Sequence, residues 1–285
     1  MNLEQLSNQP STHRVMIFGA PGSGKTWSIG KLAESHTLHY FSLENGHTTL
    51  LNPDCVIPSA RKNINIIKMF DTPETPIAAS SLDAFFKHRK GNFCEAHGRN
   101  DCTLCSKEKA PFYPLSIESL TAKDIIIIDS LTQWETSISF LLTKSTDGEV
   151  ERSGDKVFDY YRKLALYLSR SLSRIQLIDN CSIIVISHET EAEAVTGNNK
   201  IVPAGGSKNF AKSNARYFDS VLHCYKENKR HKIASSSLYS TVIDTKDRSG
   251  FDASKYNDTR EAVFALFNKS KNGDVNESTK ETAKQ

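Results

Sequence analysis

Short runs of apolar residues, many of them β-branched, alternate along the chain with longer stretches in which apolar residues recur every three or four positions. The short runs predict buried strands and the longer stretches predict amphipathic helices. The predicted strands are residues 15–19, 38–43, 64–69, 125–129, 182–187, 219–225 and 238–245. The predicted helices are residues 25–35, 80–90, 131–143 and 156–179. This alternation is typical of an α/β fold with a central, mostly parallel sheet.

The same pattern indicates how the chain is organised around that sheet. Residues 125–128 are isoleucine throughout, so we expect this strand in the middle of the sheet with both faces covered. Residues 71–123 are too long for an ordinary crossover and contain four prolines, which favours a small inserted module. We expect a core at 14–268, an N-terminal extension at 1–13 and a polar, disordered tail at 269–285.

A glycine-rich motif follows the first predicted strand directly. It has the spacing G-x-x-x-x-G-K-[ST] and consists of Gly19, Ala20, Pro21, Gly22, Ser23, Gly24, Lys25 and Thr26. Glycines at these positions let the backbone wrap an anion with its amides pointing inward. Lys25 would then reach the β- and γ-phosphates of ATP, and the Thr26 hydroxyl would bind Mg²⁺. The alternative is a strand-to-helix turn that binds nothing.

Two carboxylates are candidates for the remainder of such a site. Asp129 ends the isoleucine strand and reads as a Walker B aspartate that holds Mg²⁺ beside Thr26. Many AAA-type ATPases place a catalytic glutamate next, but this chain has Ser130, so another carboxylate must activate water. Glu44 follows the second predicted strand and is the best candidate for that role. The alternative is a surface glutamate that precedes a turn.

Four metal-ligand residues gather within the predicted insertion. Cys94 and His97 form a C-x2-H pair, and Cys102 and Cys105 form a C-x2-C pair. Gly98 between the pairs suits a tight reversal, so the four side chains could close a tetrahedral Cys3His site. Protein would then fill every position, which predicts a structural Zn²⁺ and no catalytic metal. Reduced, exposed thiols are the alternative.

Composition limits the class of protein but does not choose a partner. The chain has 285 residues, is 38% hydrophobic and carries 36 Lys and Arg against 33 Asp and Glu. Its net charge of +3 neither demands nor excludes nucleic acid. No window approaches the ~18 consecutive apolar residues of a membrane span, and six cysteines occur without a secretion signal. We therefore expect a cytoplasmic protein with no membrane partner.

The order of these motifs resembles the RecA-like recombinase and helicase core. The resemblance runs from about Arg14 to Phe267 and rests on the phosphate loop, Glu44, the segment 129–132 and a strand that ends in Ser187-His188. Within that group the chain is most similar to phage-encoded ATPases of the Sak single-strand-annealing type. The resemblance implies a RecA-like P-loop NTPase that hydrolyses ATP with Mg²⁺ and acts on single-stranded DNA. It also implies phage recombination, replication or repair in a bacterial host's cytoplasm.

The resemblance also implies roles for later residues. His188 would sense the γ-phosphate, although the family more often has Gln, and a histidine satisfied at a strand end is the alternative. The loop at 189–209 would be mobile and bind single-stranded DNA, because Gly, Asn and Lys suit a phosphate backbone. An ordinary mobile loop is the alternative there. The candidate DNA contacts are Lys200, Lys208 and Lys212.

A basic turn near the end of the core suggests an oligomer. Lys246 and Arg248 resemble the Lys-x-Arg-x-Gly element of ring-forming RecA-like ATPases, in which both cations reach the neighbouring subunit's γ-phosphate. This implies a homo-oligomeric ring or filament, with a single-strand-binding or replication protein as a further partner. A basic hairpin turn is the alternative.

Two other functions remain open from the sequence. The first is a nucleotide-dependent switch or scaffold that loads a replication protein, with little turnover stimulated by DNA. The second is a small-molecule kinase, which is weaker because no motif for an acceptor pocket accompanies the phosphate loop.

Overall fold

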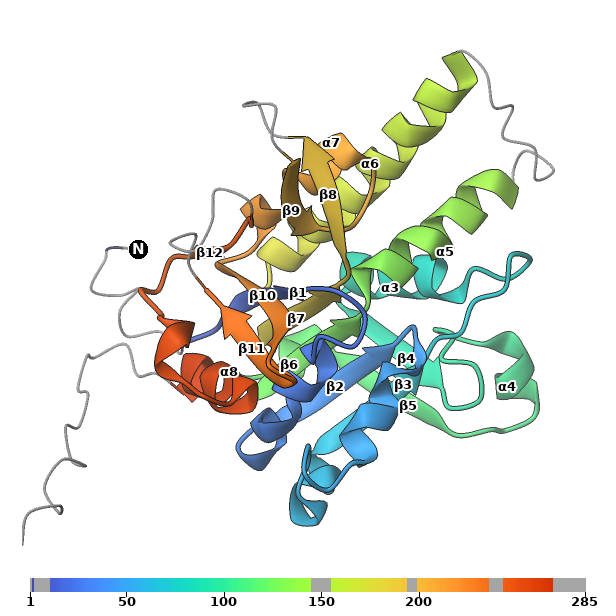
Figure 1. The fold of residues 1–285 in the computed structure, drawn as a ribbon. Helices are drawn as coiled ribbons and strands as arrows, with labels where there is room; N and C mark the ends of the chain where they lie inside the picture. Colours follow the sequence, from blue (N-terminus) through green and yellow to red (C-terminus); the bar gives the residue numbers. More distant parts are fainter. Residues whose placement is uncertain (1, 3–10, 145–154, 194–198, 236–242, 269–285) are drawn as a thin grey trace, which may run out of the picture.

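An eight-stranded sheet forms the centre of the structure, a computed structural model that describes residues 2, 11–144, 155–193, 199–235 and 243–268. The strands run in the order β11-β10-β1-β7-β6-β2-β3, with β12 also paired to β10 (Figure 1). Their bounds are β1 Arg14–Phe18, β2 Thr37–Ser42, β3 Ile64–Lys68, β6 Asp124–Asp129, β7 Ser182–Ser187, β10 Ser220–Glu227, β11 Arg230–Ala234 and β12 Lys246–Asp247. Only β11 and β12 are antiparallel to their neighbour, so the predicted mostly parallel α/β sheet is confirmed.

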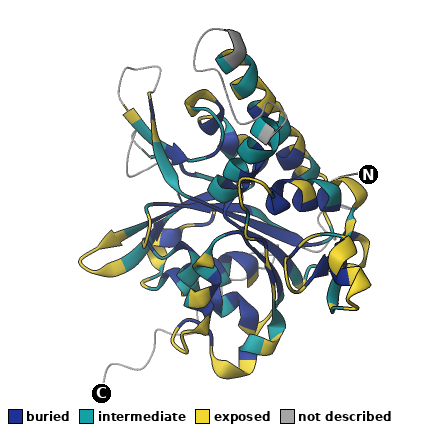
Figure 2. Ribbon diagram, turned by 90° about the vertical axis from the view of Figure 1, so that its right-hand side faces the viewer, coloured by how far each residue is buried: buried dark blue, intermediate teal, exposed yellow. Residues whose placement is uncertain are grey.

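The isoleucine strand lies inside the sheet as predicted. Strand β6 pairs with β2 on one side and β7 on the other, and its four isoleucines are fully buried. Ile126 and Ile128 belong to the core on one face, whereas Ile125 and Ile127 belong to the core on the other. Figure 2 shows the buried strands between two covering layers. A strand buried on both faces has no polar side to alternate with, which explains the uninterrupted apolar run.

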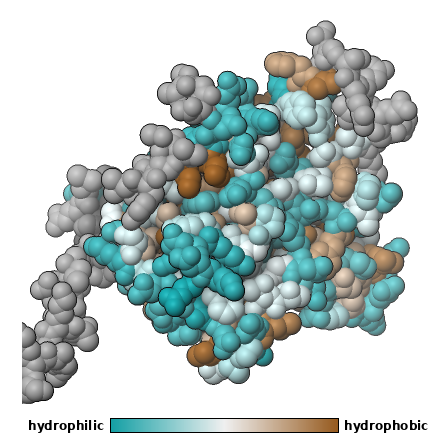
Figure 3. Space-filling view, in the orientation of Figure 1, coloured by the Kyte–Doolittle hydropathy of each residue, from teal (hydrophilic) through white to brown (hydrophobic). Residues whose placement is uncertain are grey.

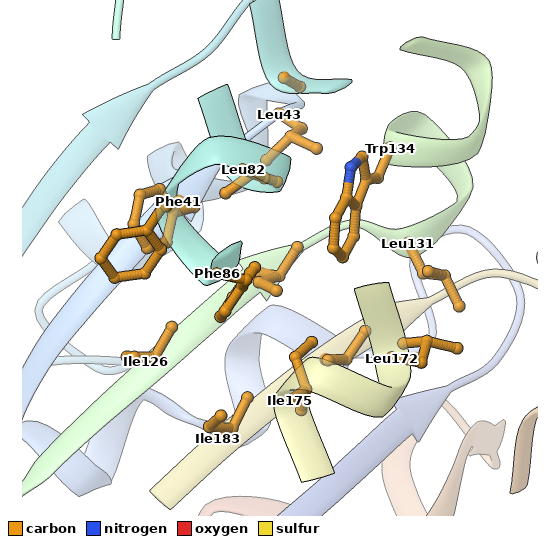
Figure 4. Packing of buried hydrophobic residues seen from close by; sticks show 14 of the residues in the cluster. Phe41, Leu43, Leu82, Phe86, Ile126, Leu131, Trp134, Leu172, Ile175 and Ile183 are labelled. Atoms are coloured by element: carbon orange, nitrogen blue, oxygen red, sulfur yellow. The ribbon is translucent and has the colours of Figure 1, made fainter. Parts of the chain in front are cut away.

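Helices cover both faces of the sheet. One layer consists of α3 Ile77–His88, α5 Leu131–Lys144 and α6 Asp155–Gln176. Their buried side chains, including Phe86, Trp134 and Leu172, form one hydrophobic core with Ile126 and Ile183 of the sheet (Figure 4). The other layer consists of α2 Lys25–Ser28, η1 Gly30–Glu34, η2 Asn45–Leu51, η3 Pro58–Asn63 and α8 Thr259–Asn268. Among the described residues no helix is long and apolar enough to cross a bilayer.

Two expectations need revision, and two others concern residues outside the described ranges. The predicted helix at 25–35 is a single α-turn, α2, followed by the 3-10 segment η1. The segment packs closely here, because a Cβ on Gly30 would lie 2.6 Å from Cys55 Sγ. Helix α3 belongs to the core layer, so the inserted module is smaller than 71–123 and consists of β4 Lys90–Cys94, α4 Thr103–Lys107 and β5 Phe112–Ser116. Strands β4 and β5 form a separate two-stranded sheet, and Phe93 and Leu115 attach it to the core. Residues 238–242 of the strand predicted at 238–245 lie outside the described residues, as does the tail at 269–285.

The segment expected as a mobile loop at 189–209 is largely a β-hairpin. Strand β8 Glu189–Glu193 pairs antiparallel with β9 Asn199–Pro203, and residues 194–198 lie outside the described residues. Helix α7 Lys208–Ala211 follows. Ala192, Val202 and Ala211 form a small buried cluster that fastens the hairpin to α7. The prediction of a loop was wrong because it gave weight to glycine and charge, whereas the hairpin is held by apolar contacts between residues that lie far apart in the sequence.

Candidate active site

The phosphate loop follows β1 at the carboxyl edge of the sheet. Gly22 and Gly24 have φ values of 72° and 97°, in the left-handed region that glycine tolerates best. The Lys25 side chain is only 8% exposed and its ammonium donates to the Gly19 and Ala20 carbonyls at 2.8 and 2.9 Å. Burial lowers the pKa of Lys25, while nearby carboxylates oppose that shift. The Lys25 ammonium therefore lies against the phosphate loop, where the phosphates of a nucleotide would bind.

The two residues predicted to bind Mg²⁺ are in direct contact. Thr26 Oγ1 donates to Asp129 Oδ2 at 2.9 Å, and the Tyr40 hydroxyl donates to the same oxygen. Burial raises the pKa of Asp129. A cation bound beside the carboxylate would oppose this shift, because an opposite charge favours the ionised form. Gly46 also lies against this carboxylate, because a Cβ there would come within 2.5 Å of Asp129 Oδ2. A hydroxyl and a carboxylate are suitable oxygen ligands for Mg²⁺.

Sequence reasoning missed Tyr40 and Gly46. Tyr40 lies in β2, the strand next to β6, and is fully buried with its hydroxyl on the carboxylate. Its signal in the sequence was a tyrosine within a predicted buried strand, since a buried tyrosine hydroxyl needs a hydrogen-bond partner. Gly46 had no such signal, since its role is to leave room.

Glu44 meets two residues that come from the ends of other strands. The Ser130 hydroxyl donates to Glu44 Oε1, and His188 Nε2 lies 3.4 Å from Glu44 Oε2. The contact with His188 contributes most to a lowered pKa of Glu44, and the Ser130 hydrogen bond adds to it. About one third of the Glu44 side chain is exposed, with a relative exposure of 34%. Glu44 is thus an ionised carboxylate that solvent can reach.

These groups line one cleft of about 430 Å³, a size typical of small-molecule sites. The predicted residues that line it are Pro21, Gly22, Gly24, Lys25, Thr26, Glu44, Asp129 and His188. The cleft also includes residues that sequence reasoning did not select, namely Trp27, Gly46, Thr49, Lys226 and His231.

Lys246 and Arg248 do not line this cleft. Strand β12 pairs with the start of β10, at Ser220 and Val221, which is the opposite end of the sheet from the phosphate loop. The Lys246 ammonium donates to two backbone carbonyls at 2.6 and 3.1 Å, and burial lowers its pKa. Any contact of these cations with a nucleotide must therefore involve another subunit, and that role stays a prediction.

The candidate DNA-binding lysines have different surroundings. Lys200 Nζ donates to Asp244 Oδ1 at 2.7 Å, so this ammonium is already paired within the chain. Lys208 and Lys212 are exposed at the two ends of the short helix α7. A paired lysine offers less charge to a phosphate backbone, so the two exposed lysines are the better candidates.

The four metal-ligand residues come together in the β4–β5 module. Their ligand atoms all lie within 4.8 Å of one another, and the three cysteines are buried. His97 Nδ1 lies 3.2, 3.8 and 4.0 Å from the sulfurs of Cys105, Cys94 and Cys102. Tetrahedral Zn²⁺ separates nitrogen and sulfur ligands by about 3.6 Å, so the arrangement fits this ion with small adjustments.

The turn between the two ligand pairs is also built as predicted. Gly98 has a φ of 64°, and a Cβ at this position would lie 2.0 Å from the Lys68 carbonyl oxygen. The module therefore contacts the edge strand β3 through a position that only glycine fits.

Comparison with known proteins identifies the family. A model of an AAA domain, AAA_24, matches residues 11–255, which is most of the chain. No curated protein matches the chain. A type III secretion ATPase of pathogenic bacteria is a similar solved structure, with 12% identity, a TM-score of 0.41, and coverage of 83% of this chain and 57% of that one.

A second solved structure is EscN assembled with its central stalk EscO from the type III secretion system of enteropathogenic E. coli. It has 13% identity, a TM-score of 0.41, and coverage of 83% of this chain and 47% of that one. The chain thus spans about half the length of the secretion ATPases that it matches. From the family match over most of its length, the chain belongs to the AAA domain family and is a nucleotide-binding P-loop ATPase.

Proposed function

We propose that this chain hydrolyses ATP with Glu44 as the group that activates the attacking water, and that its turnover responds to single-stranded DNA. The observation that carries the proposal is the position of Glu44, which shares one cleft with Lys25 and Asp129 and contacts Ser130 and His188, the residues that follow β6 and β7. In this scheme Lys25 binds phosphate, and Thr26 with Asp129 holds Mg²⁺.

The carboxylate is suited to water activation. Its lowered pKa keeps it ionised at neutral pH, and its exposure leaves an oxygen accessible to a water molecule. Ser130 and His188 restrict its orientation, which reduces the cost of aligning the water. Ser130 therefore has a use here although it replaces the glutamate found in many AAA-type ATPases.

His188 offers a route from the nucleotide to the β8–β9 hairpin. Its ring contacts Glu44, and its backbone carbonyl accepts a hydrogen bond from Ala204 N at 2.7 Å, just beyond β9. A shift of Glu44 on hydrolysis would therefore act on the segment that precedes the exposed Lys208 and Lys212. We propose that this segment contacts DNA and that the nucleotide state sets its affinity.

The order of motifs supports a place among phage Sak-type single-strand-annealing ATPases, in recombination, replication or repair. The same resemblance supports a homo-oligomeric ring or filament in which Lys246 and Arg248 act on the neighbouring nucleotide. An interaction with a single-strand-binding or replication protein belongs to the same proposal, as does a site of action in the host cytoplasm.

We further propose that the Cys3His cluster holds one structural Zn²⁺. The geometry supports it, since four ligands from the protein leave no open position for a substrate. The ion would order a short segment between β4 and β5 that contributes little apolar surface of its own.

Steady-state ATPase activity with and without single-stranded DNA, at low salt, tests the proposal. The 285-residue chain is compared with Lys25→Ala, which removes the ammonium proposed to bind phosphate. We expect DNA to raise turnover of the wild type and no turnover in the variant. Turnover that does not change with DNA would contradict the DNA role and favour a nucleotide-dependent switch or loader. Absence of turnover in the wild type under all conditions would contradict ATP hydrolysis itself.

A further inference from the structure

Strand β10 runs past the phosphate loop and brings a lysine to the cleft. Side chains of a strand alternate between faces, so Leu222, Cys224 and Lys226 share one face of the sheet. Leu222 and Cys224 are fully buried in the core on the side of α2 and α8. Lys226, two residues further on, lines the cleft together with Lys25 and Thr26. The strand thus leaves the core where the nucleotide site begins.

Lys226 and Lys25 are placed differently in this cleft. The Lys25 ammonium is buried and bonded to two carbonyls of its own loop. Lys226 is exposed, and within the described ranges no hydrogen bond or ion pair engages its ammonium. An unpaired ammonium beside two carboxylates and a phosphate loop is free to bind the anion that enters.

His231 lies directly across the hairpin from Lys226. The two residues are partners in the antiparallel β10–β11 pairing, so their side chains lie on the same face. His231 Nδ1 lies 2.9 Å from the Ser23 carbonyl, and a Cβ on Gly24 would come within 2.6 Å of that nitrogen. The hairpin therefore rests on the backbone of the phosphate loop. Figure 3 shows hydrophilic side chains over this region, whose elements are labelled in Figure 1.

The charge in the cleft calls for a second cation. Glu44 and Asp129 bring two carboxylates beside a triphosphate, and Mg²⁺ with Lys25 offsets only part of that negative charge. Lys246 and Arg248 lie at the other end of β10 in the same chain. Among the described residues, the lysines that line the cleft are Lys25 and Lys226.

We propose that Lys226 binds a phosphate group of the nucleotide in its own chain and that His231 is a positioning residue for the phosphate loop. This inference rests on the nucleotide chemistry proposed above. The β10–β11 hairpin then forms a wall of the nucleotide site, and Lys226 contributes positive charge to the phosphates from within the same subunit. No covalent step is involved, since Lys226 acts through its charge alone.

Equilibrium binding of a fluorescent ATP analogue to the 285-residue chain, with competition by ATP and ADP, tests the role of Lys226. We expect Lys226→Met to weaken ATP binding at least ~10-fold and Lys226→Arg to restore it to within about threefold. Lys232→Met is the matched control, because Lys232 lies on the same hairpin on the opposite face and lines a different cavity. A loss for ATP alone assigns the contact to the γ-phosphate, and an equal loss for ADP assigns it to the α- or β-phosphate.

Equal ATP affinities of Lys226→Met and Lys232→Met would overturn the role of Lys226. If the wild type binds ATP in that experiment, the proposed function is not affected. Absence of ATP binding by the wild type would overturn both. For His231, we expect His231→Ala to weaken ATP binding at least ~5-fold and His231→Asn, which keeps an N–H at the Nδ1 position, to restore it. If His231→Asn binds as weakly as His231→Ala while both unfold at the wild-type temperature, the positioning role is wrong.

Discussion

Replacement of Glu44 by glutamine tests the centre of the proposed mechanism. Glutamine has nearly the same shape, and its amide oxygen can still accept the hydrogen bond from Ser130. The change therefore removes the negative charge and the basicity while leaving the neighbouring contacts in place. Neither carboxylate oxygen bonds to the phosphate loop, so we expect ATP affinity to stay within about threefold.

The expected loss of turnover follows from the role of a general base. Such groups contribute ~100-fold or more, and a 100-fold loss corresponds to about 2.7 kcal/mol of transition-state stabilisation. We expect Glu44→Gln to lower kcat at least ~100-fold in a coupled steady-state assay, with the exposed Glu34→Gln as control. A kcat within about twofold of the wild type would remove Glu44 from the mechanism.

The pH profile gives an independent reading of the same residue. Contacts with His188 and Ser130 hold the pKa of Glu44 below its ordinary value of 4.5. The base is ionised above that pKa, so turnover should be on its plateau at neutral pH and fall only as pH drops through the lowered pKa. Ser130→Ala removes one contact that lowers the pKa, so the acid limb should move to higher pH. An acid limb that does not move would contradict this assignment.

Three further outcomes are expected. The chain purified without added zinc should contain about one Zn²⁺ by elemental analysis, and Cys102→Ser should lose it; metal-free wild type would contradict the site. Gly98→Ala should lower the free energy of unfolding by ~2 kcal/mol more than the control Gly250→Ala does. Both glycines have positive φ, but only a Cβ at Gly98 would meet a backbone carbonyl. Equal losses of stability would refute the close contact. Gly46→Ala should raise the Mg²⁺ concentration for half-maximal activity about tenfold by crowding Asp129, and an unchanged requirement would refute that contact.

Local pattern was sufficient for much of the fold. Six of the strands and the helices α5 and α6 lie close to their predicted positions. A strand buried on both faces leaves an uninterrupted apolar run in the sequence, and a long amphipathic helix leaves apolar residues at helical spacing. The phosphate loop and Asp129 could be predicted because both are local features. The loop residues are adjacent in the chain, and Asp129 directly follows an apolar run.

The β8–β9 hairpin and the shortened helix α2 were missed. The hairpin depends on the contact of Ala192 and Val202 with Ala211, and the break after α2 accompanies the approach of Cys55 to Gly30. Neither contact is local, so tertiary packing overrode the local signal in both places.

The sequence by itself determined the class of the site, since the loop, its lysine and threonine, and the metal-ligand spacing are short-range features. Only the tertiary structure decided which distant residues meet there. Tyr40 reaches Asp129 because β2 and β6 are neighbours, and Glu44 meets His188 across 144 residues of chain. Lys226 lines the cleft and Lys246 does not, because the end of β10 lies at the phosphate loop whereas β12 pairs with the start of β10. The order and direction of strands set these distances, and no short window of sequence records them.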